Sequence, residues 1–240
     1  MTNKLKYFIG NWKMFGNVNS FNIINQIQRF IAKNKKFYKR NKIVICVPNT
    51  LIQFFSNKIN NKFISIGAQN CHHKSENGPH TGFVNASMLK NVGAKYIIIG
   101  HSENRALGET NKVIKKKIES SFKSKLNIIF CIGETAKEKK SGKTLSIIKK
   151  QMKESLEKKY KEKKVIIAYE PVWSIGSGKI PQSNELRQIF KFIKKEYKKI
   201  LNTKKDPIVL YGGSVNEKNI KLFSPILEID GFLIGGASQF

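Results

Sequence analysis

A glutamate followed by a proline and two glycines is the stretch of this chain whose residue types most clearly suggest chemistry. Glu170 lies just beyond 165–168, an apolar run that predicts a buried strand. Pro171 fixes its own φ angle and removes a backbone donor, whereas Gly176 and Gly178 can supply unusual backbone angles and free N–H groups. We therefore predict a carboxylate base beside a hinged lid whose glycines can approach an anion. The lid is expected to comprise Pro171, Val172, Trp173, Ser174, Ile175, Gly176, Ser177, Gly178 and Lys179.

Other residues capable of chemistry occupy comparable positions beyond other apolar runs. A lone histidine is more often structural, and one lysine in a lysine-rich chain is not distinctive, so each residue is weak evidence by itself. All of them, however, fall just past the carboxyl ends of predicted strands, which is the face where α/β barrels build active sites. The residues are Asn11 and Lys13, then His101, Ser102 and Glu103, then Glu170, then Gly212, Gly213 and Ser214, and finally Gly235 and Gly236.

Eight short apolar runs, most of them rich in β-branched residues, alternate with longer amphipathic segments along the chain. Continuous apolar strands that alternate with helices indicate parallel pairing in a sheet buried on both faces. Eight such units fit a closed (β/α)₈ barrel, an α/β fold, in a single domain of residues 1–240, although a doubly wound open sheet gives a similar pattern. The expected strands are Leu5–Ile9, Ile43–Val47, Phe63–Ile66, Tyr96–Ile99, Ile128–Cys131, Val165–Ala168, Ile208–Leu210 and Gly231–Ile234. The expected helices are Ser20–Ile31, Leu51–Phe55, Ala86–Asn91, Thr110–Phe122, Leu145–Tyr160, Asn184–Ile200 and Glu217–Phe223.

Length and composition favour a soluble cytoplasmic protein. The chain has 240 residues, of which 40% are hydrophobic, and no linker divides it. No apolar stretch approaches the roughly 20 residues that span a bilayer, and the apolar run near the N-terminus is too short for a signal peptide. The three cysteines are odd in number and lack C-x-x-C spacing, which argues against disulfides and structural zinc. A metal site at Cys71, His72, His73 and His80 is an alternative whose spacing fits no common zinc pattern.

The formal net charge of +29 points toward nucleic-acid binding as a competing function. The excess is almost entirely lysine, and arginine occurs only at Arg29, Arg40, Arg105 and Arg187. Base readout commonly uses arginine forks, and binding of single strands uses stacking aromatic side chains. The lysines instead lie on polar helical faces, as in 113–118, and they indicate solvated surfaces more than a binding patch. We therefore expect no nucleic-acid or membrane partner.

Seven motifs, in order along the chain, closely resemble the triosephosphate isomerase family. Together they cover nearly the whole sequence and are highly specific. The resemblance implies a homodimeric (β/α)₈ barrel, the TIM barrel, with neither metal nor organic cofactor. It also implies interconversion of dihydroxyacetone phosphate and D-glyceraldehyde 3-phosphate in glycolysis and gluconeogenesis. The motifs are Gly10–Met14, Ala68–Asn70, Ile99–Glu103, Cys131–Glu134, Tyr169–Lys179, Tyr211–Val215 and Asp230–Ser238.

The resemblance also implies roles for the candidate residues. Glu170 would remove a proton next to the carbonyl, and a desolvated carboxylate gains basicity. His101 would polarise the carbonyl as a neutral hydrogen-bond donor, since a helix N-terminus disfavours imidazolium. Lys13 would supply positive charge near the developing enediolate and the phosphate, with Asn11 and Glu103 orienting it and Asn11 also contacting substrate. Ser102 would make a minor polar contact.

A phosphate site and a closing lid complete the expectations from the family. Backbone amides of Gly235, Gly236 and Ser214 would bind the phosphate, and Gly176 would add an amide when the lid closes. Tyr211 and Ser214 would hydrogen-bond the closed lid. Closure would hold the enediol intermediate and exclude water, which prevents loss of phosphate.

Four features depart from the family pattern. Phe83 and Asn104 stand where relatives commonly have a glutamate and an arginine that pair across the dimer interface, and Phe15 stands where an asparagine is usual. Thr81, at the end of a long loop from Gln69, would still reach the neighbouring subunit. The final helix of relatives is missing or truncated after Ala237, which predicts lower stability.

Two other functions remain open from the sequence. A related phosphosugar isomerase barrel of amino-acid biosynthesis would share the phosphate loops but would lack the combination of His101–Glu103 with Glu170. A non-catalytic basic barrel that binds RNA would show strongly salt-dependent affinity and would not require Glu170 or the lid.

Overall fold

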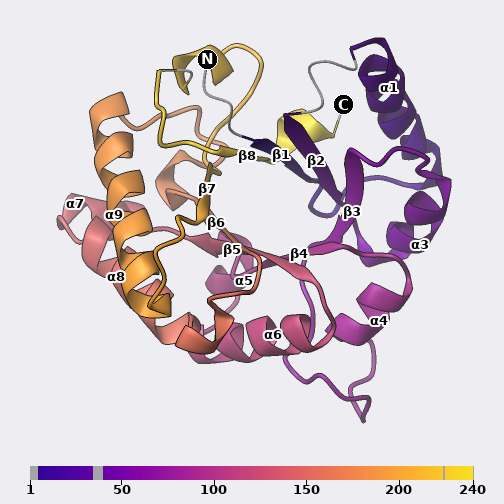
Figure 1. The fold of residues 1–240 in the computed structure, drawn as a ribbon, viewed down its shortest axis with the longest axis horizontal. Coiled ribbons are helices and arrows are strands. Elements are labelled where there is room, and N and C mark those ends of the chain that lie inside the picture. Colours follow the sequence, from indigo (N-terminus) through magenta and orange to yellow (C-terminus); the bar gives the residue numbers. More distant parts are fainter. Residues whose placement is uncertain (1–4, 35–39, 224, 240) are drawn as a thin grey trace.

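Eight parallel strands close into a barrel in the order β1-β2-β3-β4-β5-β6-β7-β8 (Figure 1). The structure, a computed structural model, describes residues 5–34, 40–223 and 225–239. The closed sheet confirms the (β/α)₈ prediction and excludes the doubly wound alternative, because β1 pairs with both β2 and β8. The strands are β1 Lys6–Asn11, β2 Asn41–Cys46, β3 Ile64–Ala68, β4 Tyr96–Ile99, β5 Asn127–Ile132, β6 Val165–Tyr169, β7 Ile208–Tyr211 and β8 Gly231–Ile234.

The longer helices surround the barrel on its outside (Figure 1). They form because their apolar residues recur at helical spacing, as with Phe21, Ile24 and Ile31, the buried residues of the first helix. The helices are α1 Phe21–Lys33, α3 Asn49–Lys58, α4 Ala86–Asn91, α5 Ser102–Ala106, α6 Asn111–Lys123, α7 Ala136–Lys140, α8 Thr144–Ser155 and α9 Ser183–Leu201. No helix in the described part of the chain is both long and apolar enough to span a bilayer.

Strand side chains alternate between the barrel interior and the helical layer. Ile98 packs in a cluster inside the barrel, together with Ile129 and Ile166 from neighbouring strands. Ile97 and Ile99, its neighbours in the chain, instead belong to the larger cluster between the strands and the helices. This period of two is what a strand buried on both faces requires.

Two predicted helices differ from the structure in extent or type, and one short helix was not predicted. The helix predicted over 145–160 ends at Ser155, where Leu156 becomes extended, and a separate 3₁₀ turn η2 covers Lys158–Tyr160. The break lets Leu156 and Tyr160 both point into the core, with the Tyr160 ring centroid 5.0 Å from that of Phe122.

The helix predicted over 217–223 is only a 3₁₀ turn, η4 Ile220–Phe223. The Asn216 side chain accepts hydrogen bonds from the N–H groups of Lys218 and Asn219, and the resulting turn takes the place of a first helical turn. Helix α7 was not predicted, although Thr135 and Glu138 form a capping box at its start.

The last strand, β8, is followed in the described residues by a 3₁₀ turn, η5 Gly236–Ser238 (Figure 1). Ala237 and Ser238 of this turn line a pocket together with residues of α1. An apolar groove of about 410 Å³ lies beside this turn, lined mainly by Phe8, Ile23, Ile27, Phe30, Ile43 and Ile234.

Candidate active site

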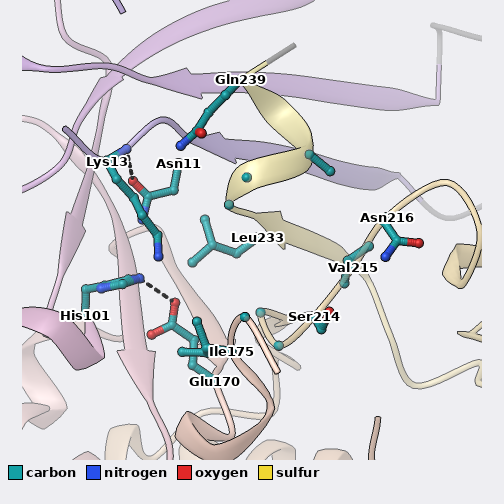
Figure 2. A pocket seen from close by; sticks show the side chains of 16 residues that line it. Asn11, Lys13, His101, Glu170, Ile175, Ser214, Val215, Asn216, Leu233 and Gln239 are labelled. Atoms are coloured by element: carbon teal, nitrogen blue, oxygen red, sulfur yellow. Dashed lines mark hydrogen bonds and ion pairs between the residues drawn. The ribbon is translucent and has the colours of Figure 1, made fainter. Parts of the chain in front are cut away.

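Residues that the sequence placed beyond five different strands meet around one cavity of about 450 Å³ (Figure 2). Because parallel strands share one carboxyl-terminal face, positions far apart in the chain converge there. Asn11 was predicted to follow the first strand, but it is the last residue of β1, which extends to Asn11. The predicted residues that line the cavity are Asn11, Lys13, His101, Glu170, Gly176, Ser214, Gly235 and Gly236.

Glu170 is buried at the end of β6, and its carboxylate faces the cavity. Two glycines make room for it: a β-carbon on Gly133 would lie 1.8 Å from the Glu170 carbonyl oxygen, and one on Gly212 would lie 2.8 Å from its Cγ. Burial raises the pKa of Glu170, because desolvation outweighs the nearby His101 ring, the Cys131 thiol and other groups that favour the ionised form. A carboxylate in this environment is a stronger base than one in water.

The His101 ring is held between the first turn of α5 and the Glu170 carboxylate. Its Nδ1 accepts a hydrogen bond of 3.3 Å from the Glu103 backbone N–H, so this nitrogen carries no proton. The opposite nitrogen, Nε2, lies 3.3 Å from Oε1 of Glu170. With Nδ1 accepting, Nε2 is the ring nitrogen placed to donate toward Glu170 and the cavity, the direction needed to polarise a carbonyl.

Lys13 combines a strained backbone with a directed ammonium group. Its φ angle is +54°, in the left-handed region that costs a residue with a β-carbon about 1 to 3 kcal/mol. The Asn11 Oδ1 accepts from its backbone N–H at 3.1 Å, and Glu103 Oε1 accepts from its Nζ at 2.7 Å. The structure thus brings Asn11 and Glu103, the two residues that the family resemblance placed around this lysine, into contact with it.

The predicted lid contains a 3₁₀ turn, η3 Val172–Ser174, and its next two residues reach the cavity wall. Gly176 and Gly178 have φ angles of +67° and +72°, which glycine adopts without strain. Ile175 and Gly176 line the cavity together with residues of the loops that follow β7 and β8. The segment predicted as a lid is therefore positioned to cover the site.

A network at the base of the lid includes residues that the sequence had not assigned to the site. The Trp173 Nε1–H donates to Glu134 Oε1 at 2.8 Å, and the Tyr169 hydroxyl donates to the same buried carboxylate. Burial raises the pKa of Glu134. The Lys139 Nζ lies 4.1 Å from the centroid of the Trp173 ring. The motif 131–134 was the signal for this network, because it places Glu134 just beyond β5.

The loops after β7 and β8 form the end of the cavity that is rich in glycine. Gly212, Gly213 and Ser214 come from one loop, and Gly235 and Gly236 from the other. The Ser214 backbone N–H, expected to face phosphate, is hydrogen-bonded to the Ser174 Oγ of the lid at 3.3 Å. Backbone amides and few side chains suit an anion such as phosphate.

The long loop after β3 holds the histidines that the sequence had offered as a metal site. Their rings stack, with centroids 4.4 Å apart for His72 with His73 and for His72 with His80. Cys71 is buried 3.8 Å from the Ser121 hydroxyl. Within residues 5–34, 40–223 and 225–239, no group of three or more histidine, cysteine or acidic side chains is arranged to hold a metal ion.

A buried carboxylate, an imidazole and a lysine around a glycine-walled cavity on a (β/α)₈ barrel define an enzyme that moves protons on an anionic substrate. The family model described as triosephosphate isomerase matches residues 6–239. The chain belongs to this family.

Individual relatives agree with that assignment. A triosephosphate isomerase of Dictyoglomus turgidum is 39% identical over 241 residues, which cover 97% of this chain and 94% of the relative. One from Mycoplasmopsis pulmonis is 39% identical over 236 residues, covering 96% and 91%. The crystal structure of triosephosphate isomerase from Bartonella henselae superposes with a TM-score of 0.85 at 33% identity, covering 98% of this chain and 93% of that one.

Proposed function

We propose that this chain interconverts dihydroxyacetone phosphate and D-glyceraldehyde 3-phosphate through an enediol(ate) intermediate, a step shared by glycolysis and gluconeogenesis. The observation that carries the proposal is the pairing of Glu170 with His101, whose facing atoms lie 3.3 Å apart at the wall of one cavity. The two groups can therefore act on adjacent carbons of one small substrate.

Each side chain has a defined part in the proposed reaction. The Glu170 carboxylate removes a proton from one carbon and returns it to the next, and its raised pKa lowers the barrier to that transfer. The His101 Nε2–H donates to the carbonyl oxygen as negative charge develops there. The Lys13 ammonium stabilises the same charge and the phosphate. Asn11 and Glu103 hold Lys13 in place through the two hydrogen bonds described above.

The substrate's phosphate would lie at the glycine-rich end of the cavity. We propose that backbone amides of Gly235, Gly236, Ser214 and, from the lid, Gly176 bind it. All four residues line the same cavity as Glu170. Amides aimed at an anion inside a site that excludes water are stronger than the same groups in solution.

A coupled assay of triose phosphate interconversion tests the proposal directly. Glu170→Gln keeps the shape of the side chain and removes the base, so turnover should fall by about 10²- to 10⁴-fold while substrate still binds. Glu162→Gln, at an exposed position, is the matched control and should turn over like the wild type. Wild-type turnover in the Glu170→Gln variant would overturn the base assignment.

We further propose that two copies of the chain associate. Met14 and Phe83, on the loops after β1 and β3, have fully and 64% exposed side chains, respectively, and Thr81 is exposed beside Phe83. Asn104 is hydrogen-bonded to Asn70 at 3.1 Å within its own chain. Both partners of the ion pair common in relatives are replaced here, by Phe83 and Asn104, so neither replacement leaves a buried charge without a partner.

Sedimentation velocity across a range of concentrations tests this association. Phe83→Glu should shift the protein toward monomer, whereas Leu227→Glu, at an exposed position after η4, should not. A wild type that remains monomeric at every concentration would contradict the proposal.

We also propose one barrel domain for residues 1–240 and a cytoplasmic location. A single closed sheet includes strands from Lys6 to Ile234, which supports one domain. Cys46, Cys71 and Cys131 are buried free thiols, as expected in a reducing compartment. Limited proteolysis that releases a stable fragment would contradict the single domain.

A further inference from the structure

Ser174 carries a hydroxyl that is buried within the lid, and the catalytic steps proposed above do not use it. Its side chain is fully buried at the end of the η3 turn. A buried hydroxyl is costly unless its donor and acceptor capacity are satisfied. The partners of this hydroxyl therefore show what the lid is attached to.

Three groups surround the Ser174 Oγ. It donates to the Lys179 carbonyl at the far end of the lid, lies 3.0 Å from the Tyr211 hydroxyl oxygen, and accepts from the Ser214 backbone N–H at 3.3 Å. One serine hydroxyl has a single proton and two acceptor sites. Since the Lys179 carbonyl only accepts, the proton of Ser174 goes there, and Tyr211 must donate.

The properties of Tyr211 and Gly213 agree with this assignment of hydrogen-bond donors and acceptors. Burial raises the pKa of Tyr211 to about 12, so its hydroxyl keeps its proton and can donate. A β-carbon on Gly213 would lie 2.3 Å from the Tyr211 hydroxyl oxygen and 2.7 Å from the Ser174 Oγ. The loop after β7 is thus wrapped closely around this hydroxyl, and only glycine fits at that point.

The Ser214 amide belongs to the cavity wall where the phosphate is proposed to bind. One N–H group can make one good hydrogen bond, so its bond to Ser174 competes with a bond to an incoming anion. We propose that Ser174 is a positioning residue that occupies the Ser214 amide while the site is empty and releases it when phosphate arrives. This inference rests on the proposed phosphate site.

The release would connect the two ends of the lid to the occupancy of the site. When the anion takes the Ser214 amide, the Ser174 hydroxyl keeps its bonds to Lys179 and Tyr211 but is no longer tied to the phosphate loop. Of the bonds made by this hydroxyl, only the one to Tyr211 then holds the lid to the barrel, and because the Ser174–Lys179 bond joins the two ends of the lid, the lid can pivot at this point as one unit. Binding of the phosphate group is thereby coupled to movement of the lid over Glu170.

Inorganic phosphate is the probe, with its dissociation constant measured by calorimetry and by inhibition of turnover. Ser174→Ala removes the competing acceptor, so phosphate should bind roughly three- to tenfold more tightly. The KM for triose phosphate should fall with it, whereas mere disruption of the lid would raise both constants. Ser146→Ala is the matched control, because Ser146 is an exposed residue of α8 outside the lid and the phosphate loops, and its hydroxyl donates to the Lys143 carbonyl. Its phosphate affinity should match the wild type.

Equal or weaker phosphate binding by a folded Ser174→Ala variant would overturn the role of Ser174. Ser174→Gly provides a second variant without the hydroxyl. If neither folds, wild-type protein labelled with ¹⁵N-serine decides: the Ser214 amide resonance must shift during phosphate titration, and an unmoved resonance contradicts the proposal. Failure of the wild type to bind phosphate at all would instead count against the proposed phosphate site itself.

Discussion

A β-carbon built on Gly133 would lie 1.8 Å from the carbonyl oxygen of Glu170. The two residues follow neighbouring strands, β5 and β6, and the Glu170 N–H donates to the Ile132 carbonyl at 2.8 Å. The backbone that carries the proposed base therefore rests directly on a residue without a side chain. The position of the carboxylate depends on this close approach as much as on the contacts of its own oxygens.

Gly133→Ala should displace Glu170 and reduce both stability and turnover. The added methyl group meets backbone rather than a flexible side chain, so the strands must separate, at a cost of about 1 to 3 kcal/mol in the free energy of unfolding. Urea unfolding and steady-state kinetics measure the two effects. Gly78→Ala is the control, because its β-carbon would have no neighbour closer than 3.7 Å. A Gly133→Ala variant with wild-type stability would contradict the reported approach.

The raised pKa of Glu170 predicts how stability depends on pH. Burial raises this pKa above its ordinary value of 4.5, so the folded protein binds the proton more tightly than the unfolded chain does. Stability contributed by this proton is complete below pH 4.5 and is lost as pH rises through the folded-state pKa. Glu170→Gln should therefore be more stable than the wild type at neutral pH, with a difference that shrinks toward pH 4.5.

Urea unfolding of both proteins between pH 4.5 and 8 measures this difference. Glu162→Gln, which removes an exposed carboxylate, should show no comparable trend. A constant difference between Glu170→Gln and wild type across that range would show that the pKa of Glu170 is not raised.

Trp173→Phe should loosen the hinge of the lid while leaving the barrel intact. The change keeps an aromatic ring beneath Lys139 and removes the N–H that donates to Glu134 at 2.8 Å. Loss of a hydrogen bond to a buried carboxylate costs about 1 to 3 kcal/mol and should raise the pKa of Glu134 further. Catalytic efficiency should fall about tenfold, and more of the intermediate should lose its phosphate.

Release of inorganic phosphate per turnover measures that side reaction. Trp12→Phe is the comparison, because the buried Trp12 Nε1 has no hydrogen-bond partner among the described residues. It should lower stability through loss of packing without increasing phosphate release. If both variants release the same amount of phosphate per turnover, the hydrogen bond between Trp173 and Glu134 does not control the lid.

The groove beside α1 should bind an apolar dye in the native state. Phe30 is 57% exposed there, and most of the surrounding side chains are aliphatic or aromatic. Native protein should therefore increase the fluorescence of anilinonaphthalene sulfonate, and Phe30→Ser should reduce that increase at least twofold with unchanged turnover. Leu227→Ser, at an exposed position outside the groove, should leave the signal as it was.

The sequence predicted those parts of the fold in which hydrophobic pattern and local chemistry agree. Strands β4 and β8 and helix α4 have the predicted bounds, because an apolar run or a cap marks both ends of each. The break after Ser155 was not predictable in the same way. The local hydrophobic pattern after Ser155 is still that of a helix. The helix ends there because Leu156 and Tyr160 are buried against other elements, and such tertiary packing overrides local helix preference.

Site residues were predictable where position along a strand determines position in space. Glu170, His101 and Lys13 each lie within two residues of the end of a strand, so the barrel alone brings them together. Hydrogen bonds between loops were harder to predict. Tyr211 and Ser214 were expected to contact the lid, but nothing in the sequence indicated that both would hydrogen-bond to one hydroxyl, that of Ser174.

The pairing of β1 with β8 joins residue 7 to residue 231 and residue 10 to residue 234. A chain emerging from the ribosome therefore completes its sheet only when nearly all of it has been synthesised. Until then, β1 and the latest strand to form each present an open edge that can pair with another chain. Such a nascent chain needs protection from aggregation late in translation, and a stop codon before β8 should yield insoluble protein rather than a smaller barrel.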